Sequence, residues 1–239
     1  MTERHRTVGD PAPEISARWD DEQAEVQEAY AIYAAPLADD LERAGFPVAR
    51  LRDLRRRGVG GPAALPVLLH WLPRVTFAAL KVDVIYALGS PWARPAACRP
   101  LLDEHAFLHD EPGEAARRVR VAICSSLERI ADESVLEEIV ALATDQSLGA
   151  ERGMGVVALG NMRHARERVT PLLVELLADE QIELFALLGL SKIGARDTIR
   201  EFAIRTRHRN PMIRRLAVRT VAAWTSKVKP PPRHDSDRT

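Results

Sequence analysis

Apolar residues recur through most of the chain with the spacing of an amphipathic α-helix. In residues 213–224, for example, Ile213, Leu216, Ala217 and Val221 stand at positions i, i+3, i+4 and i+8. This spacing places them on one side of a helix. Similar stretches follow one another from about residue 64 onward, so the pattern predicts an all-α fold.

The helical stretches are repeated copies of one motif. An Ala-Leu-Gly step, or a variant of it, recurs near the end of successive stretches, with a degenerate copy at residues 221–223. The central residues of these steps are 31 to 39 positions apart, and they are Leu88, Leu127, Leu159, Leu190 and Ala222. A period of this length is typical of proteins built from stacked helical repeats.

Each of these helices follows another apolar stretch, to which a short polar segment such as residues 144–147 connects it. A unit of two helices cannot cover its own apolar face, so neighbouring units are expected to stack. The predicted first helices lie at residues 64–72, 95–102, 135–143, 169–177 and 198–204.

The second helices resemble those of HEAT repeats, in particular the short bacterial kind also found in phycobilisome-lyase-like proteins. Such helices read Val-Arg, two residues, Ala, and then Ala-Leu-Gly before a turn of small residues. Here Val119 and Arg120 precede Leu127, Arg152 stands seven residues before Leu159, and turns of the expected kind occur at residues 158–162 and 189–194. The resemblance covers about residues 64–224. It implies a right-handed α-solenoid of about five stacked antiparallel helix pairs, an armadillo-like superhelix, and says little about function.

The N-terminal region is expected to cap this solenoid. Three helices are predicted at residues 21–35, 36–44 and 48–57, separated by Pro36 and by the Ala-Gly-Phe-Pro segment 44–47. The predicted organisation is a disordered N-terminal tail at 1–18, a helical cap at 19–60, the repeats at 61–226 and a disordered Pro-rich polar tail at 227–239.

Composition agrees with a helical protein. Apolar residues make up 46% of the chain and aromatic residues only 5%, which favours helices over a β-sandwich. The two cysteines, Cys98 and Cys124, have no CxxC or Cys/His spacing and suggest neither a zinc site nor a disulfide. No leader or membrane-spanning segment is evident. We therefore expect a cytoplasmic protein without a cofactor.

Charge is zero overall but unevenly distributed. Residues 10–42 hold ten acidic residues against one basic residue, whereas residues 192–239 hold 13 Lys and Arg against four Asp and Glu. The C-terminal candidate site is a cluster of six arginines, Arg205, Arg207, Arg209, Arg214, Arg215 and Arg219. Two interpretations stay open for it: a patch that binds phosphate or an acidic protein, and a polar cap that keeps the last repeat soluble.

A second set of charges is defined by the repeat itself. The position seven residues before the central residue of each step holds Lys81, Arg120, Arg152, Glu183 and Arg215, so four of five are cations. They could form a basic stripe. The interpretation we favour is that these side chains bridge neighbouring repeats by pairing with acidic residues of the turns, such as Asp145.

Enzymatic activity finds little support in the sequence. HEAT-like alkylpurine DNA glycosylases use aromatic residues and a nearby carboxylate, for which the candidates here are Trp71, Tyr86, Trp92 and Asp83. His105 and His109 have the i, i+4 spacing of metal ligands but lack an evident third ligand. No catalytic residue is therefore assigned.

The function predicted from the sequence is a non-enzymatic scaffold or adaptor that binds another protein on its concave face. The alternative is a DNA-binding or glycosylase-type repair protein that uses the basic C-terminal end. A positive groove with exposed Trp92 or Tyr86 and a free carboxylate would favour this alternative.

Overall fold

The computed structural model of the chain describes the backbone of residues 13–47, 51–55 and 61–226, and the side chains of residues 24–47, 51–54 and 61–226. Within these ranges the protein consists of α-helices and short 3-10 helices and contains no strand. The predicted all-α fold is confirmed.

Eleven α-helices are formed by the described residues. They are α1 (Pro13–Arg43), α2 (Leu65–Trp71), α3 (Ala78–Leu88), α4 (Cys98–Phe107), α5 (Glu114–Ile130), α6 (Leu136–Thr144), α7 (Gly153–Leu159), α8 (Arg166–Glu175), α9 (Glu183–Ile193), α10 (Ile199–Ala203) and α11 (Pro211–Thr225). The 3-10 helices are η1 (Leu51–Arg55), η2 (Pro62–Ala64), η3 (Pro91–Ala93), η4 (Glu133–Val135), η5 (Gln146–Arg152), η6 (Leu176–Ala178) and η7 (Arg196–Thr198). No helix among the described residues has the length and apolar character needed to cross a bilayer.

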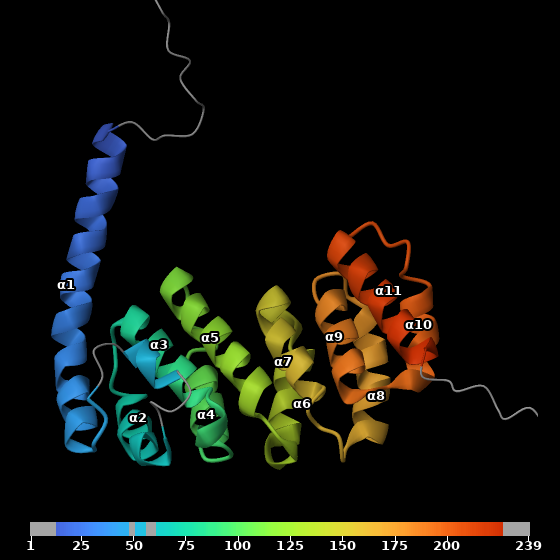
Figure 1. Cartoon of the computed structure of the whole chain (residues 1–239), viewed down its shortest axis with the longest axis horizontal. Helices are drawn as coiled ribbons and strands as arrows, with labels where there is room; N and C mark the ends of the chain where they lie inside the picture. Colours follow the sequence, from blue (N-terminus) through green and yellow to red (C-terminus); the bar gives the residue numbers. More distant parts are fainter. Residues whose placement is uncertain (1–12, 48–50, 56–60, 227–239) are drawn as a thin grey trace, which may run out of the picture.

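The helices lie in a row, with α1 at one end and α11 at the other (Figure 1). Consecutive helices pack as the pairs α2 with α3, α4 with α5, α6 with α7, α8 with α9 and α10 with α11. The second helices of these pairs also contact one another in the order α3, α5, α7, α9 and α11. Each pair therefore buries its apolar side against the next pair.

The leucines that mark the repeat occupy the core. Leu88, Leu127, Leu159 and Leu190 are all completely buried. Small residues let the second helices approach closely, most clearly at Gly160, where an added Cβ would lie 2.8 Å from the backbone oxygen of Gly189. The close contact between α7 and α9 therefore depends on glycine at this position.

The N-terminal region differs from the prediction of three helices. One helix, α1, runs through Pro36 and ends only before Gly45, whose φ of 88° requires a residue without a side chain. Proline interrupts one backbone hydrogen bond, but Leu37 and Leu41 just after it are completely buried and hold this part of α1 against the row. Tertiary packing thus outweighs the local break.

Two further boundaries were wrong in this region. Helix α1 begins at Pro13, inside the segment 1–18 that was expected to be a disordered tail. Of the third predicted helix, residues 48–57, the described residues form the 3-10 helix η1 (Leu51–Arg55). Residues 1–12, 48–50, 56–60 and 227–239, including the whole predicted C-terminal tail, lie outside the described residues.

Candidate functional site

A groove lies between three helices of the described structure. It has a volume of about 840 Å³ and is open to solvent. Helix α1 forms one wall, α3 the floor and α5 the other wall, at the α1 end of the row (Figure 1). The residues that line it are Val26, Gln27, Tyr30, Ala78, Ala79, Val82, Asp83, Tyr86, Glu114, Ala115, Arg117, Arg118 and Val121, and we call it the α1–α5 groove.

A hydrogen bond across the groove connects α1 to α3. The Tyr30 hydroxyl donates to Asp83 Oδ2 over 2.6 Å. Burial, followed by this hydrogen bond to a carboxylate, raises the pKa of Tyr30 well above its usual range. Tyr30 therefore stays protonated and fixes the carboxylate of Asp83 in the floor of the groove.

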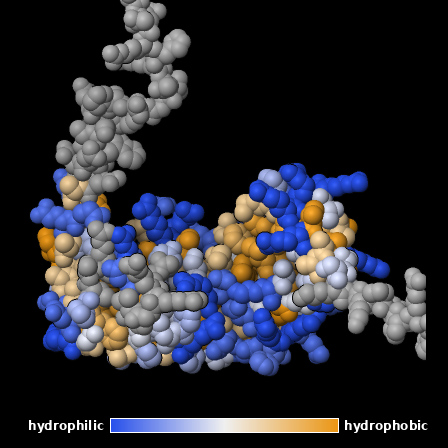
Figure 2. All heavy atoms as spheres, in the orientation of Figure 1, coloured by the Kyte–Doolittle hydropathy of each residue, from blue (hydrophilic) through white to orange (hydrophobic). Residues whose placement is uncertain are grey.

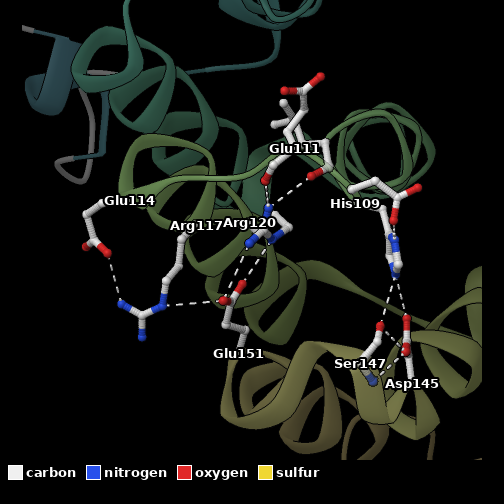
Figure 3. A network of polar contacts seen from close by, with 10 residues as sticks. His109, Glu111, Glu114, Arg117, Arg120, Asp145, Ser147 and Glu151 are labelled. Carbon is white, nitrogen blue, oxygen red and sulfur yellow. Dashed lines mark hydrogen bonds and ion pairs between the residues drawn. The ribbon is translucent and has the colours of Figure 1, made fainter.

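The α5 wall carries charges of both signs. Arg117 and Arg118 contact the carboxylate of Glu114 at 3.4 and 3.3 Å, and Arg117 also lies 3.3 Å from Glu151 (Figure 3). Hydrogen bonds from Arg118 and then Arg117 lower the pKa of Glu114. All three side chains of this rim are more than half exposed, so incoming polar groups can exchange with these pairs.

Three of the repeat-column cations, Lys81, Arg120 and Arg152, are buried. Lys81 forms a buried ion pair with Glu104. Arg120 donates to Glu151 Oε2 at 2.9 Å and to the backbone oxygens of Leu108 and Glu111 at 3.0 and 2.9 Å (Figure 3). These side chains connect each helix pair to the next, and they do not form a basic stripe on the described surface.

Arg152 is the most buried of the side chains at the column position. Its side chain is 2% exposed, and it binds the carboxylate of Asp179 and the backbone oxygens of Ala143 and Gly149. Asp145, named above as an example of a pairing partner, binds His109 instead, with 2.8 Å between Oδ2 and Nε2. The partner acids are thus specific to each junction.

The same connection occurs with reversed charges at the next junction. Glu183 holds the column position on α9, and Arg205 donates to it from Nε over 2.7 Å. His208 Nε2 lies 3.3 Å from the same carboxylate. Arg205, which belonged to the predicted basic patch, is therefore largely buried in an ion pair.

The remaining arginines of that patch are more exposed. Arg209 pairs with Glu180 at 2.8 Å. Arg214 and Arg215 donate to backbone oxygens, those of His208 and Pro211 respectively. Within the described residues, Arg207, Arg214, Arg215 and Arg219 have no carboxylate partner. Five of the six arginines of the patch are thus exposed, and three of them, Arg214, Arg215 and Arg219, lie on α11.

The glycosylase candidates are divided between two places. Asp83 and Tyr86 line the α1–α5 groove. Trp71 instead donates from Nε1 to Asp40 over 2.8 Å, and Trp92 packs against the core. The carboxylate of Asp83 accepts the Tyr30 hydrogen bond, so this pair lacks the free carboxylate that the DNA alternative requires.

The histidine pair lies between α4 and α6. His109 contacts Asp110 and Asp145 at 2.7 and 2.8 Å, and these hydrogen bonds raise its pKa. His105 is buried, with no partner for Nε2 in the described structure, and burial lowers its pKa to about 4. No group of three or more metal-binding side chains occurs among the described residues.

The groove itself was missed by the sequence analysis. One signal was available: Val82 and Val121 both stand six residues before a repeat leucine, so the alignment of repeats could have placed them on one surface. The wall formed by α1 has no such signal because α1 lies outside the repeat.

Comparisons with known proteins found no relative of the chain. No family model, curated protein or solved structure matches the chain.

Proposed function

We propose that the chain is a non-enzymatic scaffold of HEAT-type repeats that binds a segment of another protein in the α1–α5 groove. In this proposal the five helix pairs form a right-handed α-solenoid with α1 as its cap, and the groove is the first part of its concave face. The observation that carries the proposal is the groove, an open cavity of about 840 Å³ that apolar side chains of α1, α3 and α5 line beside a charged α5 rim.

The shape of the groove suits a helix. Ala78, Ala79 and Ala115 leave room above α3, and Val82 and Val121 offer apolar contacts. A cavity that encloses a small ligand usually buries most of the ligand's surface, whereas this groove is partly open to solvent. An amphipathic helix inserts apolar side chains at i, i+3, i+4 and i+7 into grooves of this kind.

The charges of the groove indicate which charged side chains a partner helix carries beside its apolar face. Arg117 and Arg118 project from the α5 rim and are 53% and 72% exposed. A carboxylate of the partner could replace Glu114 as their acceptor at little cost, since exposed ion pairs contribute little. The expected partner is therefore a helix with an apolar face and an acidic flank.

The DNA alternative has less support. A polyanion requires a surface of one sign, but Asp83 and Glu114 line the groove together with the two arginines. The column cations Lys81, Arg120 and Arg152 are engaged in buried pairs. A cytoplasmic location is part of the proposal, because Cys98 and Cys124 are free thiols that a reducing compartment maintains.

The test is a selection of peptides from a random helical library on the wild-type protein. Ala79→Trp fills the groove from an exposed position of α3, so the selected peptides should lose binding to this variant. Their sequences should share apolar residues at i, i+3 or i+4 and i+7 and an acidic neighbour.

Ala203→Trp is the matched control, because Ala203 is also an exposed helical alanine but lies on α10. It should bind the peptides as the wild type does. Equal binding to Ala79→Trp would contradict the proposal. Tight binding of duplex DNA that Ala79→Trp abolishes would favour the DNA alternative.

A further inference from the structure

The junctions between helix pairs follow one rule. At four junctions, the side chain at the column position forms an ion pair with an oppositely charged side chain that belongs to the next helix pair of the row. These ion pairs are Lys81 with Glu104, Arg120 with Glu151, Arg152 with Asp179, and Glu183 with Arg205. A charge at this position therefore marks the place where another helical unit docks.

Arg215 holds the same position on α11, where the row ends. Its side chain is exposed, and its Nε donates only to the backbone oxygen of Pro211, over 3.3 Å. No carboxylate within the described residues pairs with it. The last helix thus presents the charge that forms an ion pair at the other junctions, but no further helices within the described residues pack against it.

The surface around Arg215 is unlike a purely polar cap. Met212 and Val218 are 57% and 51% exposed, and they flank Arg215 and Arg219 on one side of α11. Hydrophilic residues dominate the surface over α11 in Figure 2, with hydrophobic residues among them. Terminal repeats that only solubilise a solenoid have a polar outer face, so this mixed face is suited to an interface.

The opposite end of the row has the complementary character. On the outer side of α1, Glu25, Glu28 and Asp39 are exposed, and Ile32 between them is 67% exposed. Spacings of three, four and seven residues place these side chains on one face of the helix. The buried Leu37 lies on the other side of α1, toward the row.

We propose that the outer face of α11 binds the outer face of α1 in a second copy of this chain. Arg215 and Arg219 then meet the carboxylates of Glu25 and Glu28, while Met212 and Val218 cover Ile32. Because the two faces are different and lie at opposite ends of the row (Figure 1), copies associate head to tail and form rings or open chains. This association is independent of the partner bound in the α1–α5 groove.

The experiment uses two charge-reversed proteins and measures mass by sedimentation velocity over a roughly hundredfold range of concentration. One protein carries Arg215→Glu with Arg219→Glu, and the other carries Glu25→Lys with Glu28→Lys. At low salt the wild-type average mass should rise with concentration, and about 1 M salt should return it to the monomer value. Each variant alone should stay monomeric, because its altered face repels the other face of an identical copy.

Mixing the two variants decides the matter. Each reversed face then meets a reversed face of the other protein with opposite charge, so association should return only in the mixture. Arg129→Glu with Arg163→Glu is the matched control, since both side chains are exposed and far from α11 and α1 in the row. It should associate like the wild type. A wild-type protein that stays monomeric, or a mixture that does not associate, would overturn the proposal and leave α11 to a foreign partner or to the chain's own C-terminal segment.

Discussion

Arg152 provides the sharpest test of the connections between helix pairs. In Arg152→Met the side chain keeps a similar length but loses every donor. The buried backbone oxygen of Ala143 and the half-buried one of Gly149 lose hydrogen bonds of 2.9 and 3.1 Å, and Asp179 loses its cation. We expect the free energy of unfolding to fall as a result.

The magnitude follows from burial. Breaking a buried ion pair by removing one partner costs about 3 to 5 kcal/mol. Asp179 is 34% exposed and regains some hydration, which lowers the expected loss to about 3 kcal/mol. Single domains are stable by about 5 to 15 kcal/mol, so the midpoint of unfolding should shift clearly.

The assay is urea unfolding followed by far-UV circular dichroism. Arg168→Met is the matched control, because Arg168 pairs with Glu137 of another helix pair but both side chains are more than half exposed. It should unfold like the wild type. If Arg152→Met also unfolds at the wild-type urea concentration, the buried junctions do not stabilise the row.

Three further predictions concern buried groups. Gly160→Ala should lower stability by about 2 kcal/mol, because the new Cβ would lie 2.8 Å from the Gly189 oxygen, and an unchanged thermal midpoint would contradict this. Burial, and secondarily the nearby His109, lowers the pKa of His105 from 6.5 to about 4. Between these two pKa values only the unfolded chain binds the proton, so the free energy of unfolding should fall as the pH is lowered. In urea titrations at several pH values, His105→Gln should reduce this dependence of stability on pH. Burial raises the pKa of Cys98 to about 11 and of Cys124 to about 12, so alkylation should require unfolding, and rapid labelling of the native protein would refute it.

Hydrophobic period and repeat spacing were sufficient to predict the helices and much of the core. The leucines at the repeat steps are completely buried, and the predicted second helices correspond to α3, α5, α7, α9 and α11. These features are local, because a period of three to four residues directly reports which side of a helix is covered. The column position of Arg120 and Arg152 was likewise visible from the alignment of repeats.

Only the tertiary structure decided the partners of these residues. Tyr30 and Asp83 are 53 residues apart in sequence, and they meet because α1 packs beside α3. Pro36 marked a break in the sequence, yet the burial of Leu37 keeps α1 continuous. Arg205 belonged to a basic cluster by sequence but turns inward to Glu183. Periodicity specifies which face of a helix is buried, whereas the contacts across that face depend on how the helices approach one another in space, which no local pattern contains.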